Sequence, residues 1–279
     1  METDGDVHVR PVYLAGDRYT GDFALQPLFE LPGIQRHHDE LGNFYLATGD
    51  GRIRLGFIPE QDWDTLWQIA VAPAPFAEPR WTASFSEATP TEIVTAVTTE
   101  LARMYRPEDD TWLTERTAGP AEWTAPYTTV GWTQDPRDRG RLTLTSPDGH
   151  ITAVHSWSPL SPSEAEQAGQ DGRYTLSTRS NTGWYGRFSS RTPARILAAA
   201  TTTILDPAPV IRYRSELRHL SRHSATITPI LPPPPSPLDV QRTAARIRST
   251  SPTTRAAAPA TSTSARLAWT STTPTGRHR

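Results

Sequence analysis

The sequence contains no cysteine and no lysine, and these two absences exclude several kinds of chemistry. Without cysteine the chain can form no disulfide, no thiolate nucleophile and no cysteine-ligated zinc or iron–sulfur centre. Without lysine it has no Gly-Lys pair of the kind that binds phosphate, and no Gly-x-Gly-x-x-Gly segment is present either. No apolar run approaches the roughly 18 residues that a membrane-spanning helix requires, so we expect no membrane partner.

The beginning of the sequence lacks the features of a secretory signal. Residues 1–6 are acidic and precede no apolar segment, so we expect no signal peptide and a cytoplasmic location. With 279 residues the chain is long enough for one or two domains with a substantial core. Hydrophobic residues make up only 36 %, which indicates that part of the chain does not fold.

Charge divides the chain into two unequal parts. Residues 1–211 contain 17 Arg against 28 Asp and Glu, whereas residues 212–279 contain 11 Arg against 2 acidic residues. The net charges are therefore −11 and +9. The second part is rich in Ser, Thr, Pro and Ala and has few large apolar residues, so we predict a mostly disordered tail over residues 211–279.

An internal repeat is the clearest architectural signal in the sequence. Residues 46–53 and 144–151 lie 98 positions apart, and each stretch places Asp-Gly between two alternating segments. Asp-Gly in this setting predicts a tight β-hairpin turn. At an offset of 103, residues 81–86 correspond to residues 184–189.

A helical pattern follows each copy of this last strand. Thr89-Pro90 opens the first pattern and Thr192-Pro193 opens the second. In the first copy Thr89 is predicted as the N-cap, Pro90 occupies the first helical position, and Glu92 completes a capping box.

Two pairs of aromatic residues indicate which side of each strand faces the core. Trp81 and Phe85 share one parity along their strand, as do Trp184 and Phe188, so each pair lies on one face of the sheet. We predict that this is the face beneath the helix.

These patterns predict an α+β protein with two tandem repeats. Each repeat is expected to form an antiparallel β-sheet with one helix, and the two are expected to pack as a pseudo-dimer, because one such unit has only a small core. The predicted parts are an N-terminal segment (1–24), repeat 1 (25–106), an acidic linker (107–122), repeat 2 (123–210) and the tail (211–279).

The repeat resembles the SPDY family, a domain of unknown function of Streptomyces and close relatives that usually occurs as two tandem copies. The family is named after a Ser-Pro-Asp-Tyr motif. Its first three positions are matched by Ser146, Pro147 and Asp148, and Gly149 replaces the tyrosine. Further matches are Tyr13-Leu14-Ala15-Gly16, residues 81–86 with Thr89-Pro90, and residues 207–210. The resemblance covers roughly residues 9–215 and implies an architecture but no established activity.

Two clusters could be read as sites of chemistry. Ser146, Asp148 and His150 are the residue types of a catalytic triad, but they lie within five residues of one hairpin, where Asp-Gly is better explained by the turn. The run from His37 to Glu40 lacks the spacing of metal ligands and is predicted as a solvated loop. We therefore expect no metal, no cofactor and no catalytic activity.

The strand residues that face away from the predicted core give a candidate binding face. This face consists of Arg52, Arg54, Tyr185 and Arg187. Aromatic and arginine side chains together suit single-stranded nucleic acid, whereas the −11 charge of residues 1–211 opposes phosphate binding. We expect a non-catalytic binding or adaptor protein with an unknown protein partner; the alternative is a single-stranded nucleic-acid binder that uses this face and the basic tail.

Overall fold

The computed structural model divides the chain into two compact units, Met1–Ile230 and Leu231–Arg279. The elements described below belong to the first unit. The residues that the structure describes are 5–17, 22–59, 65–136, 140–157, 172–179, 183–219, 224–230, 238–239 and 241–242. Most of the predicted disordered tail, from residue 231 onward, therefore lies outside the described residues.

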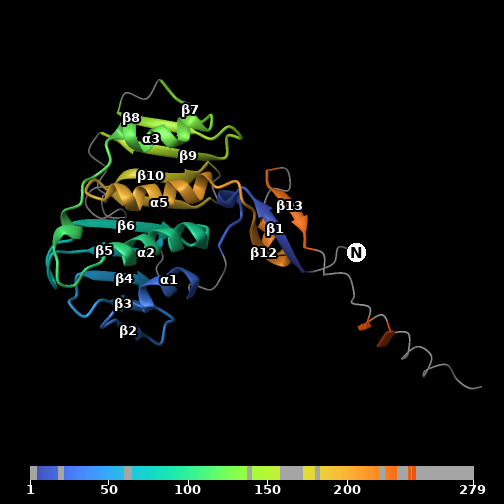
Figure 1. Cartoon of the computed structure of the whole chain (residues 1–279). Coiled ribbons are helices and arrows are strands. Elements are labelled where there is room, and N and C mark those ends of the chain that lie inside the picture. The colour runs from blue at the N-terminus through green and yellow to red at the C-terminus, as the bar shows by residue number, and fades with distance from the viewer. Residues whose placement is uncertain are drawn as a thin grey trace, which may run out of the picture. The chain divides into compact units, whose positions relative to one another are not determined.

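One ten-stranded antiparallel sheet contains both repeats, in the strand order β2-β3-β4-β5-β6-β11-β10-β9-β8-β7 (Figure 1). Repeat 1 supplies β2 (Gln35–His38), β3 (Phe44–Ala47), β4 (Ile53–Phe57), β5 (Thr65–Val71) and β6 (Trp81–Ser86). Repeat 2 supplies β7 (Thr133–Gln134), β8 (Arg141–Thr145), β9 (Ile151–Ser156), β10 (Gly172–Thr178) and β11 (Tyr185–Ser189). The two repeats are thus joined where β6 pairs with β11.

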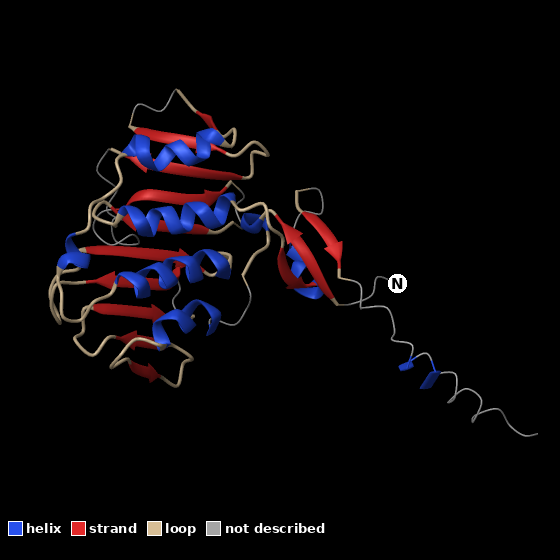
Figure 2. Ribbon diagram, viewed as in Figure 1, coloured by secondary structure: helices blue, strands red, loops and turns tan. Residues whose placement is uncertain are grey.

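Among the described elements, four helices lie on one face of this sheet (Figure 2). They are α1 (Asp22–Phe29), α2 (Thr91–Met104), α3 (Pro120–Thr129) and α5 (Ala194–Leu205). The α+β class is confirmed, and each repeat has a second helix, α1 or α3, that the sequence pattern did not indicate. Both are short and contain an internal proline, Pro27 or Pro126, which weakens the helical signal.

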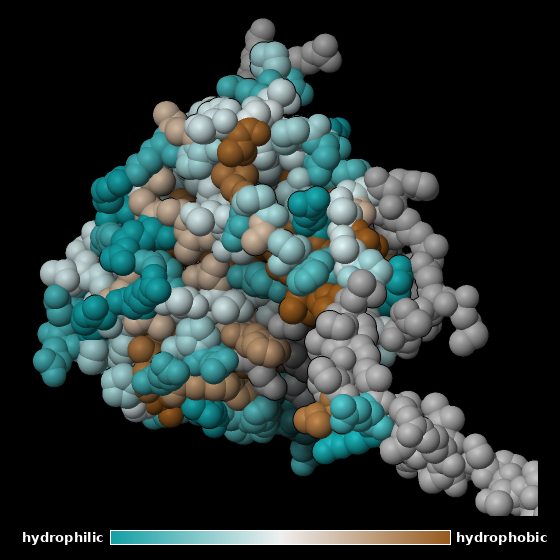
Figure 3. Space-filling view, turned by 45° about the vertical axis from the view of Figure 1, so that its right-hand side comes forward, coloured by the Kyte–Doolittle hydropathy of each residue, from teal (hydrophilic) through white to brown (hydrophobic). Residues whose placement is uncertain are grey.

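The core lies between the helices and the sheet. Trp81 and Phe85 are buried there, as are Trp184 and Phe188, which confirms the predicted core face. Within the predicted linker, Trp112 and Leu113 belong to a short 3₁₀ helix (Thr111–Thr114) and are also buried in this core. On the side of the molecule that Figure 3 shows, hydrophobic residues occur in small groups separated by hydrophilic ones.

The joint between β6 and β11 has a local two-fold symmetry. Ser84 pairs with Arg187, and the flanking pairs join Ala83 to Phe188 and Phe85 to Gly186. The two flanking pairs are equivalent to each other. Gly186 lies 103 positions after Ala83, and Phe188 lies 103 positions after Phe85, which is the offset between the repeats. The equivalent rings of Phe85 and Phe188 meet edge to face, with centroids 5.6 Å apart. The predicted pseudo-dimer is therefore confirmed, as one continuous sheet.

Side-chain hydrogen bonds repeat the same symmetry on both sides of this joint. The amide of Tyr185 donates to Ser86 Oγ at 2.9 Å, and the amide of Thr82 donates to Ser189 Oγ at 3.0 Å. These two serines are repeat equivalents, as are the two donors. Each serine therefore satisfies a backbone donor of the other repeat at the end of the paired strands.

The predicted capping box of α2 is wrong. The helix has Pro90 at its N-cap position, without a side-chain hydrogen bond. The hydroxyl of Thr89 donates instead to the carbonyl of Tyr185 at 2.9 Å, across the joint, and Glu92 pairs with Arg212. The side chains of Thr89 and Glu92 thus bind partners about a hundred residues away in sequence. A local sequence pattern cannot predict such contacts.

A second, three-stranded sheet joins the two ends of this unit. β1 (Asp6–Arg10) lies between β12 (Val210–Tyr213) and β13 (Thr226–Pro229), antiparallel to both. Residues 211–219 and 224–230, which the sequence placed in the tail, thus contribute two strands and a 3₁₀ helix (Arg214–His219). Strands of four residues are too short for the alternation of polar and apolar residues to predict them.

A buried ion pair fastens the small sheet to the start of α2. Arg212 on β12 is only 1 % exposed and makes a bidentate pair with Glu92, at 2.7 and 2.6 Å. Its guanidinium also donates to the carbonyl oxygens of Ala15 and Gly16. The charge is therefore neutralised and most of its donors are satisfied.

A second set of contacts connects the N-terminal segment to repeat 2 through the short 3₁₀ helix Val12–Leu14. The indole of Trp184 donates to the carbonyl of Tyr13 at 2.8 Å, and the hydroxyl of Tyr13 donates to Asp148 at 2.6 Å. The N-terminal segment thus contacts the strand and the hairpin turn that define repeat 2.

We predict that Arg212→Ala lowers the free energy of unfolding by about 3 kcal/mol, because Glu92 and two carbonyls lose a buried cationic partner. Urea denaturation measures this change. As a control, Arg116→Ala removes a bidentate pair with Glu122 that lies at the surface, and it should leave the midpoint unchanged. Equal effects of both substitutions would contradict the structural role of Arg212.

Stability should also depend on the protonation of His155. Burial, with Arg173 nearby, lowers the pKa of His155 below 6.5, and its ring lies against Tyr174 and Trp157. The unfolded chain then binds a proton more readily than the folded protein, so stability falls as the pH drops through and below 6.5. We expect His155→Phe to reduce the difference between urea midpoints at pH 7.5 and pH 5.5. Repeat 1 has Phe57 at the equivalent position. An undiminished difference would assign the effect to other groups.

Candidate functional site

The face of the sheet opposite the helices differs between the two repeats. In repeat 2 this face carries Thr143, Thr152 and Thr175 on β8, β9 and β10, with Arg173 and Arg187 farther along the same face. In repeat 1 the corresponding positions hold Tyr45, Arg54 and Gln68. The two halves of one sheet thus present different chemistry to their surroundings.

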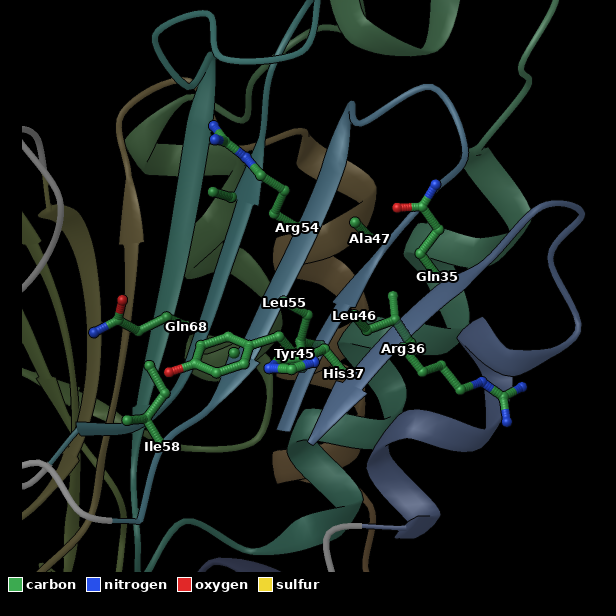
Figure 4. Close-up of a pocket in the computed structure, with 12 residues that line it drawn as sticks. Gln35, Arg36, His37, Tyr45, Leu46, Ala47, Arg54, Leu55, Ile58 and Gln68 are labelled. Atoms are coloured by element: carbon green, nitrogen blue, oxygen red, sulfur yellow. The ribbon is translucent and has the colours of Figure 1, made fainter. Parts of the chain in front are cut away.

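A shallow hollow of about 440 Å³ lies on this open face, over β2 to β5 of repeat 1. Its side chains form two rows across the strands (Figure 4). One row consists of His37, Tyr45, Gly56 and Gln68, and the other of Gln35, Ala47, Arg54 and Ala70. Ile58 adds an apolar wall next to the first row.

Gly56 allows the side chain of Ile58 to lie close against β4 next to the first row. A Cβ atom at this position would lie 3.1 Å from Ile58 Cδ1 and 3.7 Å from Tyr45 Cδ1. Repeat 2 has Val154 at the equivalent position, so the same place on its face holds a side chain. Glycine within a strand often marks a close approach of a ligand or another chain.

Arg54 supplies the cationic group of the hollow. Its Nη2 donates to the carbonyl of Ala77 at 3.4 Å, which is a long hydrogen bond. Its Nε is buried and has no hydrogen-bond partner among the described residues. A buried donor without an acceptor costs about 1–3 kcal/mol.

The electrostatic character of the hollow is opposite to that of residues 1–211 as a whole. Among the described residues that line it, none is a carboxylate, whereas two are arginines and one is a histidine. Arg36 alternates with His37 along β2, so its side chain lies on the helical face, where its guanidinium stacks over the ring of Phe29 at 3.9 Å. His37 stacks on Tyr45 on the open face, with ring centroids 6.3 Å apart. Among the described lining residues, Arg54 is therefore the arginine whose side chain lies on the open face.

The loop between β5 and β6 borders the hollow at Arg54. In this loop Phe76 is 96 % exposed and has a φ of 62°, in the left-handed region that a non-glycine residue seldom adopts. The next residue, Ala77, accepts the hydrogen bond from Arg54, and Pro75 lies close to Gly51 in the β3–β4 turn. Both ends of this loop tip are thus held while the aromatic ring projects outward.

The four residues of the predicted binding face do not form one surface. Arg54 lines the hollow, but the guanidinium of Arg52 pairs with Asp50 and Asp110 at the end of the sheet, and its side chain is 18 % exposed. Arg187 and Tyr185 lie on β11, three strands from β4 and so about 14 Å away. There the guanidinium of Arg187 stacks over the ring of Tyr185 at 4.2 Å.

Sequence reasoning found Arg54 but missed the residues that surround it. Tyr45 and Gln68 share its face only because of the strand register, which the sequence alone does not give. Gly56, five residues after the predicted Asp-Gly turn, was the available signal, because a glycine inside a strand often marks a close approach of another group.

The Ser-Pro-Asp-Gly segment lies in the hairpin turn between β8 and β9. Asp148 accepts hydrogen bonds from Ser146 Oγ, from the amide of His150 and from Tyr13. Burial raises the pKa of Asp148, but these hydrogen bonds outweigh it and hold the pKa below 3.8. Gly149 has a φ of 75°, as the turn requires. This arrangement positions a turn and brings no imidazole between a nucleophile and a carboxylate.

The run of His37 and His38 is divided between the two faces of the sheet. His37 stacks on Tyr45 on the open face, whereas His38 packs against Phe44 on the helical face, with ring centroids 4.5 Å apart. In the part of the chain that the structure describes, no group of three or more histidine and acidic side chains is arranged to hold a metal ion.

The fold and the hollow define a tandem-repeat α+β protein in which one repeat carries a candidate binding site. The model of the SPDY family, a domain of unknown function (DUF317), matches residues 49–108 and again residues 145–210. The chain therefore contains two SPDY domains in tandem, which confirms the resemblance. No curated protein and no solved structure shows significant similarity to it.

The two family matches cover equivalent parts of the repeats. They include β4 to α2 in the first copy and β9 to α5 in the second. The shared region therefore contains the joint between β6 and β11, whereas β2 and β3, which supply His37 and Tyr45, precede the first match. No helix of the described ranges is both long and apolar enough to cross a membrane.

We predict that Gly56→Val fills the hollow without destabilising the fold. Valine favours strands, and the nearest atom to its Cβ is the flexible end of Ile58. The melting temperature should equal or exceed that of the unchanged protein, and a crystal structure should show the two methyl groups beside Tyr45. A large drop in melting temperature would mean that the backbone here cannot accept a side chain.

Proposed function

We propose that this protein is a non-catalytic binding or adaptor protein and that the hollow on repeat 1 binds a protein partner. The observation that carries the proposal is the hollow itself, which Tyr45, Arg54 and Gln68 surround on the open face of repeat 1. A concave surface lined by apolar and aromatic side chains and a few polar groups is typical of binding sites.

The difference between the repeats supports the same proposal. The two copies share the joint and the core, but Arg54 and Gly56 of repeat 1 are replaced by Thr152 and Val154 in repeat 2. If the open face served only to meet water, the small polar residues of repeat 2 would suit both halves. The exposed ring of Phe76 next to the hollow adds an aromatic group of the kind that is enriched at protein interfaces.

The lining of the hollow favours binding over catalysis. Among its described residues the only hydroxyl is that of Tyr45, and no carboxylate is available as a general base. Binding of single-stranded nucleic acid is the weaker alternative, because Arg52 is held in ion pairs and Arg187 lies three strands from Arg54.

Affinity capture with matched variants tests the proposal. The full chain, Gly56→Val and Val154→Ala serve as baits in lysate of the source organism, with nuclease added to remove nucleic-acid bridges. We expect one or more proteins to be retained by the unchanged chain and by Val154→Ala, which alters the equivalent position of repeat 2, and to be lost with Gly56→Val.

Two results would contradict the proposal. If the same proteins are retained by all three baits, the partner binds elsewhere. If nuclease treatment abolishes all specific capture and the chain binds oligonucleotides with a steep salt dependence, the nucleic-acid alternative holds instead.

A further inference from the structure

We infer that the hollow binds a proline-rich segment of the partner protein in the polyproline II conformation, and that a proline ring of this segment packs on the ring of Tyr45. This inference rests on the proposed function and specifies the chemistry of the partner. Three features of the described residues carry it: the placement of the Tyr45 ring, the pairing of the strands beneath it and the hydrogen-bonding groups of the lining.

The ring of Tyr45 forms an aromatic platform on the open face. Tyr45 pairs directly with Gly56, and its Cδ1 lies 3.7 Å from the place that a Cβ atom of Gly56 would occupy. Because glycine has no side chain, the ring can cross β4 toward Gln68 on β5, with Ile58 beside it (Figure 4). His37 lies on the neighbouring strand, and its ring plane is inclined by 23° to that of Tyr45. The side chain of Tyr45 remains 38 % exposed, so a ligand can pack on it.

The position of the platform selects the mode of peptide recognition. Strand addition requires a free strand edge, but β3, β4 and β5 each pair with a strand on both sides. Docking of an amphipathic helix requires a continuous apolar groove, whereas Gln35 and Gln68 interrupt the apolar surface of this shallow hollow. A polyproline II segment needs neither, because it packs its proline rings on aromatic side chains and has no internal hydrogen bonds.

The hydrogen-bonding groups of the lining match the backbone of such a segment. Proline has no N–H, so a proline-rich segment offers carbonyl oxygens and few donors. The hollow supplies N–H and O–H donors from the exposed side chains of Gln35, His37, Tyr45 and Gln68. A segment that already has the polyproline II conformation before binding also loses less conformational entropy, which suits an open site with few contacts.

The same lining is less suited to two other ligands that stack on aromatic rings. Sugar hydroxyls donate as well as accept, and carboxylates are their strongest acceptors, but the described lining contains no carboxylate. The bases of a nucleic acid come with phosphate groups, which the net charge of −11 over residues 1–211 repels. A segment of prolines carries no charge.

Nuclear magnetic resonance titration of the full-length protein tests the inference. The probe is hexaproline with an acetylated N-terminus and an amidated C-terminus. The observable is the pair of side-chain Nε2–H resonances of Gln68, which is identified by its disappearance in Gln68→Glu. We expect these resonances to shift saturably, with a dissociation constant on the order of millimolar for so short a peptide.

Two tyrosine variants separate the platform from a general effect of exposed rings. Tyr45→Thr introduces the residue that repeat 2 has at the equivalent position, Thr143, and removes the platform. The affinity for hexaproline should fall about tenfold, because one aromatic contact is lost. As a matched control, Tyr213→Thr changes a tyrosine of similar exposure, 42 %, on β12 and should leave the affinity unchanged. Circular dichroism verifies that both variants are folded.

Several results would overturn the inference. Hexaproline might be expected to act only through its length, so a glycine–serine hexapeptide with the same blocked ends is titrated in parallel, and equal affinity of the two peptides contradicts a proline-specific site. Absence of any saturable shift, or equal affinity of Tyr45→Thr and Tyr213→Thr, contradicts it as well. Tighter binding of maltohexaose or of a thymidine hexanucleotide would assign the platform to sugars or to nucleic acid instead.

The proteins captured above separate this inference from the proposed function. Hexaproline, added at several times its dissociation constant, should elute from the full-length bait the proteins that Gly56→Val fails to retain. If those proteins stay bound, the proline-rich ligand is refuted and the proposed function stands. A response to hexaproline without any captured protein would refute the proposed function.

Discussion

The pairing of β6 with β11 determines where the other parts of the molecule lie. Because of this pairing, the helices of both repeats cover a single sheet and share one hydrophobic core. Phe85 contacts Phe188 at the centre of that sheet. The pairing also hides two strand edges that would otherwise be open to association with other chains. Since Gly186 would bring a Cβ atom to 3.0 Å from the ring of Phe85, even one added carbon would disturb this joint.

The joint also explains how the two repeats could diverge. The two repeats are held together by the common core, and the ion pair of Arg212 with Glu92 lies away from the open face. Substitutions on that face therefore cost little folding free energy. At equivalent positions repeat 2 has Thr152 and Val154 where repeat 1 has Arg54 and Gly56 beside the hollow, which we interpret as a specialised binding surface.

The sequence predicts what is encoded locally and fails where distant segments meet. The Asp-Gly turns and the parity of Trp81 and Trp184 follow from short patterns, and the structure has both features. Thr89 fits a local N-cap pattern, yet its hydroxyl binds a carbonyl of the other repeat. The pairing of β1 with β12 joins residues about 200 positions apart, and no pattern in either strand predicts it. The hollow was missed for the same reason, because strand register assembles it and only Arg54 stood out as a single residue.

Photo-crosslinking in the source organism tests most directly whether the open face of repeat 1 is a protein-binding surface. A photoreactive phenylalanine replaces Tyr45 in the hollow or, in a parallel strain, its repeat equivalent Thr143. We expect a discrete crosslinked protein from position 45 and none from position 143. Equal crosslinking at both positions, or crosslinks from position 45 to nucleic acid alone, would contradict it.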